Sequence, residues 1–198
     1  MKAIKNWDKV QEASSGFEVL PVGGYVCEIK MAEEKSNKNN NGTHLEISFD
    51  VCEGDYRGFF AQDYKGQTRE DKFWRGVIRQ NIPLEGAEKY KKQCQFFKRF
   101  TTCLEKSNEG YTWDWHEERL KGKKIGVVFG EVERESARGI RYMVTMPQTI
   151  VTVEAVRTDD YKVPEPKMLG YAALPGTAPA AQNPFGSAIA DDDTDLPF

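Results

Sequence analysis

Residues 125–146 read IGVVFGEVERESARGIRYMVTM, and two apolar runs in this stretch indicate the fold class. In residues 125–134, the first apolar side chains recur at every second position. In residues 140–146, apolar side chains again alternate with others. A period of two is typical of a β-strand with one face toward a core. The polar residues 135–139 between the runs predict a turn, so the stretch is predicted to form two long strands.

The chain on both sides of this stretch continues the pattern. Pro147 interrupts the second strand, and residues 149–156 are predicted to be extended again. Upstream, residues 85–106 favour a helix, because apolar side chains recur there with a period near 3.6. They are Tyr90, Cys94, Phe97, Thr101 and Leu104. Residues 71–81 favour a shorter helix that ends at Pro83.

Three further strands are predicted before the helices. Residues 25–33 alternate so that one face carries Tyr25, Cys27, Ile29 and Met31. Residues 44–53 place Leu45, Ile47, Phe49 and Val51 inward. The polar, Asn-rich loop 34–43 joins these two strands as a hairpin. A third strand is expected at residues 57–64.

Three strands, a helix and two long strands are the element order of an OB-fold, a small Greek-key barrel. The prediction is therefore a mainly β (α+β) protein: an OB-fold-like five-stranded barrel with a helical insertion between strands 3 and 4. A mixed sheet with helices packed on one face fits the same order.

The composition narrows the class of protein. The chain has 198 residues and a formal net charge of −3, and without the four aspartates near its C-terminus the remainder carries +1. Attraction to a nucleic acid would therefore depend on local clusters of cations. No apolar run has the length of a membrane span or signal peptide, so a cytoplasmic protein is expected. Four scattered cysteines and two histidines predict neither a metal site nor a cofactor.

The chain divides into four parts. Residues 1–16 form an N-terminal arm, 17–168 the folded domain, 169–190 a flexible linker and 191–198 an acidic tip. The tip cannot order itself by burial, because it has four carboxylates and few apolar groups. It is expected to be disordered alone and to bind a partner with an apolar pocket and nearby cations. The residues expected to bind are Asp191, Asp192, Asp193, Asp195, Leu196, Pro197 and Phe198.

Cations beside aromatic residues predict a surface for single-stranded DNA. Phosphates need a basic groove, and unpaired bases stack on exposed rings. The loops after strands 1 and 4 flank the binding face of an OB-fold, and both loops carry cations. The predicted nucleic-acid-binding residues are Tyr25, Lys30, Lys35, Lys38, Tyr64, Lys65, Arg69, Lys72, Trp74, Arg75, Lys123, Lys124, Arg134, Arg138, Arg141 and Tyr142.

Other interpretations stay open. Any single aromatic residue is more often part of a core than of a stacking surface. No phosphate-binding loop or nucleophile elbow is present in the sequence, so an enzyme is not expected. A metal-dependent nuclease would have to use Asp50, Glu53 and Asp55, which flank a glycine turn where acids are common. A protein-binding adaptor without DNA binding, or an annealing protein, is the remaining alternative.

The chain also has two resemblances to known families. Residues 191–198 resemble the acidic tip of bacterial single-stranded-DNA-binding proteins, which docks replication and repair enzymes; Leu196 stands where that family usually has Ile. Much of 17–168 resembles a family of phage-encoded proteins regarded as single-stranded-DNA-binding. The motifs that carry this second resemblance are LPVGGY at 20–25, GDYRG at 54–58, LKGKKIGV at 120–127 and DYKVP at 160–164. Together they imply a phage protein of DNA replication or recombination that coats exposed strands and recruits partner enzymes.

Overall fold

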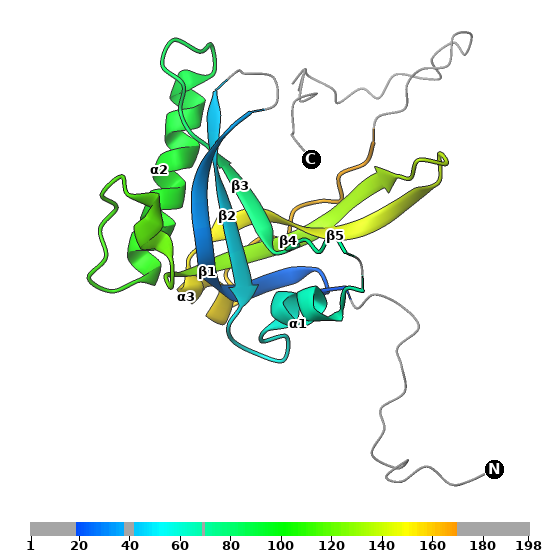
Figure 1. Cartoon of the computed structure of the whole chain (residues 1–198). Helices are drawn as coiled ribbons and strands as arrows, with labels where there is room; N and C mark the ends of the chain where they lie inside the picture. Colours follow the sequence, from blue (N-terminus) through cyan, green and yellow to red (C-terminus); the bar gives the residue numbers. More distant parts are fainter. Residues whose placement is uncertain (1–18, 38–41, 69, 170–198) are drawn as a thin grey trace, which may run out of the picture.

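A computed structural model describes residues 19–37, 42–68 and 70–169 (Figure 1). Its centre is a five-stranded antiparallel open sheet with the strand order β3-β2-β1-β4-β5. The strands are β1 (Gly23–Ser36), β2 (Thr43–Val51), β3 (Val77–Asn81), β4 (Lys124–Glu135) and β5 (Arg141–Val151). The helices are α1 (Phe59–Gly66), α2 (Tyr90–Ser107), α3 (Val153–Arg157) and the short 3-10 helix η2 (Glu117–Leu120).

Most long elements confirm the sequence prediction. The strands predicted at 25–33, 44–53, 125–134 and 140–146 are all present, and the long helix at 85–106 begins at Tyr90. The inward side chains of β2 are almost completely buried, as the alternation predicts. The β1–β2 hairpin is closed by a hydrogen bond of 3.0 Å from Asn37 N to Gly42 O. Strong periodicity over a long segment therefore identifies these elements.

The strand predicted at 57–64 is wrong, because most of this segment forms helix α1. Gly58 has a left-handed φ of 76°, which ends the extended backbone before the helix. The buried carboxylate of Asp50 then accepts hydrogen bonds from the backbone N–H groups of Phe60 (2.9 Å) and Ala61 (3.3 Å). These donors lack partners inside a helix, so Asp50 stabilises the start of α1 from the end of β2.

The short helix predicted at 71–81 is also wrong, since residues 77–81 form strand β3 against β2. Gly76 explains the outcome. Its carbonyl accepts a 2.8 Å hydrogen bond from Phe49 N, and a Cβ at Gly76 would lie 2.4 Å from Phe49 O. Close backbone approach and the β-branched pair Val77–Ile78 favour the sheet over a weak helical period.

Two irregularities in the sheet correct finer predictions. In β1 the register shifts between Ile29 and Met31, so Ala32 is buried and Met31 is 48% exposed instead of facing the core. β5 continues past Pro147, which was predicted to interrupt it, but the register shifts there: Phe129 pairs with Pro147 and Val128 with Thr149. β5 lies at the sheet edge, where a residue without an N–H group is tolerated.

The segment predicted to be extended after Pro147 is also shorter than expected. Its end, Val153–Arg157, forms helix α3. The side-chain oxygen of Thr152 caps this helix by accepting a 3.1 Å hydrogen bond from Ala155 N. The extended prediction for 149–156 therefore holds only up to Val151.

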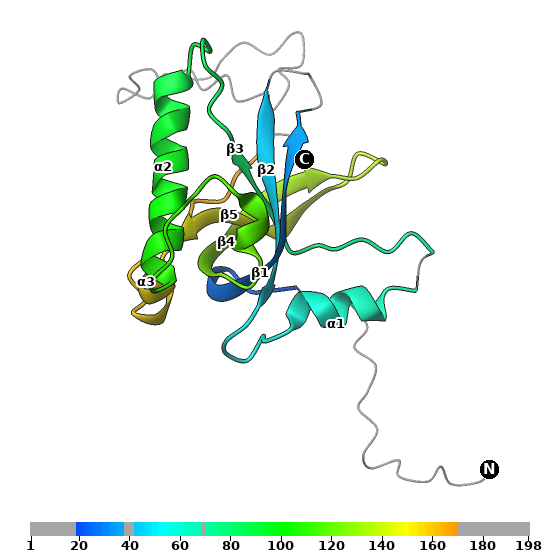
Figure 2. The same cartoon turned by 60° about the vertical axis from the view of Figure 1, so that its left-hand side comes forward.

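The core connects the sheet to its helices. One cluster of buried residues joins the inner faces of β1, β2 and β4 to Phe97, Phe100 and Leu104 of α2. Phe60 of α1 belongs to the same cluster. Figures 1 and 2 show α1 and the far end of the β4–β5 hairpin lying away from α2. In the described part of the chain, no helix is long and apolar enough to cross a membrane.

Candidate nucleic-acid interface

Two rings meet where α1 leads into the segment before β3. The centroids of Tyr64 and Trp74 are 5.9 Å apart, with an interplanar angle of 45°. Trp74 is fixed, because its Nε1–H donates to Phe49 O at 3.0 Å and its ring packs against the core. Tyr64 is 38% exposed. The pair therefore presents one anchored ring and one open ring.

Phe73 is a second ring with exposed surface. Its side chain is 47% exposed. The buried amide of Gln67 fixes the Phe73 backbone: Nε2 donates to Phe73 O at 2.9 Å, and Oε1 accepts from Phe73 N at 3.0 Å. The segment is thus held in place although it lacks regular secondary structure.

Cations lie directly beside these rings. Lys72 Nζ is 5.9 Å from the centroid of the Tyr64 ring, and Arg75 Cζ is 5.3 Å from that of Phe73. Arg75 also forms an ion pair of 3.3 Å with Asp63. Lys65 is exposed in the last turn of α1. We call Tyr64, Lys65, Lys72, Phe73, Trp74 and Arg75 the ring cluster.

The β4–β5 hairpin carries the second group of predicted residues. Tyr142 is 48% exposed, and Arg138 is exposed in the turn. Arg141 pairs with Glu133 and Glu135 at 3.8 and 3.5 Å, and Arg134 Nη2 lies 3.2 Å from Met146 Sδ. In both views the hairpin extends to the side that carries α1 and the segment before β3 (Figures 1 and 2).

The remaining described candidates lie elsewhere. Tyr25 packs against the core, with edge contacts to Tyr56 and Phe129 at 5.7 and 5.4 Å. Burial raises the pKa of Tyr25 to about 12. Lys123 lies 4.7 Å from the centroid of the Tyr111 ring, and Lys124 pairs with Glu53 at 2.8 Å. These residues are engaged within the fold and are not brought together with the ring cluster.

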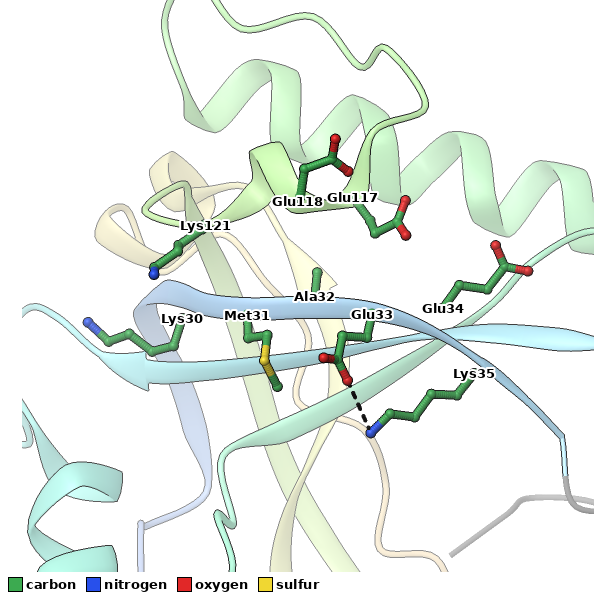
Figure 3. A pocket seen from close by; sticks show the side chains of 9 residues that line it. All are labelled: Lys30, Met31, Ala32, Glu33, Glu34, Lys35, Glu117, Glu118 and Lys121. Atoms are coloured by element: carbon green, nitrogen blue, oxygen red, sulfur yellow. Dashed lines mark ion pairs between the residues drawn. The ribbon is translucent and has the colours of Figure 1, made fainter.

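Lys30 and Lys35 line a mixed-charge hollow of about 590 Å³ on the outer side of β1 (Figure 3). Lys30 pairs with Glu28 at 2.7 Å, and Lys35 pairs with Glu33 and Glu46 at 3.5 and 2.5 Å. The other charged residues that line the hollow are Glu34, Glu117, Glu118 and Lys121. With four glutamates against three lysines, the hollow does not offer the positive groove predicted beside the β1–β2 loop.

Several predictions lie outside the described residues. These are Lys38, Arg69, the arm 1–16, nearly all of the linker 169–190, and the whole tip with Asp191, Asp192, Asp193, Asp195, Leu196, Pro197 and Phe198. They stay predictions.

Two of the three acids considered for a nuclease have other partners, and the third, Asp55, is exposed. Asp50 binds the backbone of α1, and Glu53 accepts hydrogen bonds from Arg157 and Lys124. Hydrogen bonds from Arg157 and Lys124 lower the pKa of Glu53 to about 2. Across residues 19–37, 42–68 and 70–169, no three His, Cys, Asp or Glu side chains gather as a metal site.

Phe73 is the ring that sequence reasoning missed as a surface residue. The predicted nucleic-acid-binding residues include Trp74 and Arg75 but not Phe73. The available signal was Gly76, which argues against a helix interior and for an extended segment with alternating sides.

Comparison with protein-family models finds no match for this chain, and a search of curated proteins finds none either. The two resemblances described above therefore stay predictions.

Proposed function

We propose that this protein binds single-stranded DNA through the ring cluster and the cations of the β4–β5 hairpin. The observation that carries the proposal is the set of exposed rings beside cations at Tyr64 and Phe73. Every base has a π-face, so stacking on such rings is tolerant of sequence, and it is available only when the base is unpaired. The proposal is of a binding protein, not an enzyme.

The architecture supports an OB-like barrel. An OB-fold is a five-stranded, partly open barrel whose binding face is flanked by its loops 1–2 and 4–5. Here β1 pairs with both β2 and β4, and α2 lies between β3 and β4 in the sequence. The ring cluster precedes β3, and the β4–β5 hairpin extends on the same side.

In the cell, the proposed role is to coat strands exposed during phage DNA replication or recombination. Several copies would bind one strand, because the recognised features repeat in every nucleotide. The tip at residues 191–198 would recruit partner enzymes, and the linker would raise their effective concentration at the exposed strand. The resemblances support this role, and the ring cluster supports the DNA contact.

The decisive experiment combines Tyr64→Ala with Phe73→Ala. Each stacked base contributes about 1–3 kcal/mol, so the double variant is expected to bind labelled oligo-dT at least about tenfold more weakly. Fluorescence anisotropy at two salt concentrations measures the affinity, with a duplex of equal length for comparison. The native chain is expected to prefer the single strand and to weaken as salt rises.

Leu84→Ala is the matched control. Leu84 is 44% exposed, close to the value for Phe73, but lies in the loop before α2. This variant is expected to retain native affinity, and thermal melting should show all three proteins folded. Equal binding of single strand and duplex by the native chain, or native affinity in the double variant, would overturn the proposal.

The tip needs a separate test. Removing residues 196–198 is expected to abolish capture of replication and recombination enzymes while oligo-dT affinity stays the same or rises. The apolar end and the terminal carboxylate are then both lost. Undiminished capture by the shortened chain contradicts recruitment through the tip without affecting the DNA-binding proposal.

A further inference from the structure

The outward face of α2 is a row of cations. It carries Lys91, Lys92, Lys98, Arg99 and Lys106, all of them exposed. Residues seven apart lie almost on one line along a helix, about 10.5 Å from each other. Lys92, Arg99 and Lys106 form one such line, and Lys91 and Lys98 form a second beside it. Neither line belongs to the ring cluster.

Within the described structure, the cations of this face form no ion pairs. The single acidic residue of α2, Glu105, accepts a 3.1 Å hydrogen bond from Trp113 N. Among the described residues, no carboxylate lies within ion-pair distance of the five cations. Cations elsewhere, such as Arg79, Arg119 and Arg157, do have carboxylate partners. Neighbouring like charges on a helix repel each other, and a bound anion relieves that repulsion.

An exposed ring lies beside the cations. Phe96 is 51% exposed, with Lys92 Nζ 5.9 Å from its ring centroid. Trp115 is 72% exposed and stacks at 5.9 Å and 14° on Phe97, whose side chain faces the core. Trp115 also has a φ of 65°, a left-handed conformation that is unfavourable for a bulky residue. Such strain persists only where the surroundings impose it, and it is common at binding sites.

A basic face alone is often only a solvated surface. Unpaired cations next to open rings are more specific, because phosphates and bases occur together in a nucleic acid. Figures 1 and 2 show α2 apart from α1 and from the far end of the β4–β5 hairpin. The face is therefore separate from the ring cluster.

We propose that the outward face of α2 binds the phosphodiester backbone of the DNA strand as a second contact surface. The inference rests on the proposed function, since it extends the path of a strand held at the ring cluster. A short oligonucleotide occupies only the ring cluster, whereas a longer strand continues around the domain to α2. Phe96 lies beside Lys92, where a base of that continuing strand can stack.

The test uses the full chain with Lys92→Ala, Arg99→Ala and Lys106→Ala together. Alanine keeps the helix, because its helix propensity is the highest. Anisotropy is measured with oligo-dT of about 8 and about 30 nucleotides over a range of salt; single OB-folds cover about 4–16 nucleotides. With the long oligonucleotide we expect about tenfold weaker binding at low salt and a salt slope smaller by about two. The short oligonucleotide should bind within about twofold of native.

The control removes the same charge elsewhere. Arg79→Ala, Arg119→Ala and Arg157→Ala each delete a cation that has a carboxylate partner. This triple variant is expected to bind both oligonucleotides close to native, and circular dichroism checks the folding of both triples.

Each result decides between the surfaces. Native affinity of the α2 variant for the long strand overturns the second surface and leaves the ring cluster untouched. Equal weakening with both lengths overturns it too, because α2 would then be part of the first contact. If the Tyr64/Phe73 double variant binds normally, the proposed function fails instead. A duplex of about 30 base pairs that loses as much affinity as the single strand supports the backbone contact and removes the stacking on Phe96.

Discussion

The ring cluster and the outward face of α2 differ in the groups that each offers to a nucleic acid. The ring cluster has several rings, but Arg75 is already paired with Asp63. The outward face of α2 has five exposed cations that form no ion pair with a described carboxylate. Rings give short-range contacts to unpaired bases, whereas unpaired cations give attraction that depends on salt. Affinity per base and salt dependence can therefore come from different surfaces of one small domain.

Substituting Gly76 with alanine should separate the two surfaces most strongly, by damaging only the ring cluster. A Cβ at this position would lie 2.4 Å from Phe49 O and 2.7 Å from the Phe60 ring. Backbone at Phe49 cannot move without disturbing β2, so we expect a loss of about 2–3 kcal/mol in the free energy of unfolding. Urea denaturation measures this loss. Binding of the short oligonucleotide should fall with it, while the salt slope contributed by α2 is kept.

Gly66→Ala is the matched control. Gly66 ends α1, and no atom lies within 4 Å of a Cβ placed there. Alanine is more favourable than glycine in a helix by about 0.5–1 kcal/mol, so stability should be unchanged or slightly higher. A Gly76→Ala protein as stable as the Gly66→Ala protein would show that the segment before β3 adapts freely.

The same segment shows where sequence patterns stop being sufficient. Long elements such as β2, β4 and α2 were predictable, because burial of one face repeats many times along each of them. Residues 57–81 were assigned the wrong elements because their structure depends on distant partners. Asp50 stabilises the first turn of α1, and Phe49 pairs with Gly76. No local period encodes contacts of this kind.

The candidate site shows the same limit. The sequence named Tyr64 and Trp74 as separate candidates, and the structure brings their ring centroids to 5.9 Å from each other. The sequence did not separate paired cations from unpaired ones, since pairing across strands depends on register. Lys35 lies near Glu46 only because β1 and β2 pair with that register. The cations of α2 were visible in the sequence, but their lack of ion pairs in the described structure needed the fold.

The smallest expected effect concerns Lys124, a predicted DNA-binding residue that forms an ion pair with Glu53 in the structure. Glu53 accepts hydrogen bonds from Arg157 and Lys124, which lower its pKa from an ordinary value of 4.5 to about 2. The charged form is thus favoured in the folded state. Its stabilising contribution is complete above about pH 4.5 and is lost as the pH falls toward 2.

Glu53→Gln should therefore lower the melting temperature by only about 2 °C at pH 7, because the pair is partly solvated. The difference in melting temperature between this variant and the native chain should decrease steadily from about pH 4.5 to pH 2. Calorimetry at several pH values measures this difference. Oligo-dT affinity should change less than twofold, since Lys124 lies apart from the ring cluster. A difference that stays constant with pH would mean that shape rather than charge stabilises this contact. A large gain in affinity would return Lys124 to the DNA path and weaken the contrast between paired and unpaired cations.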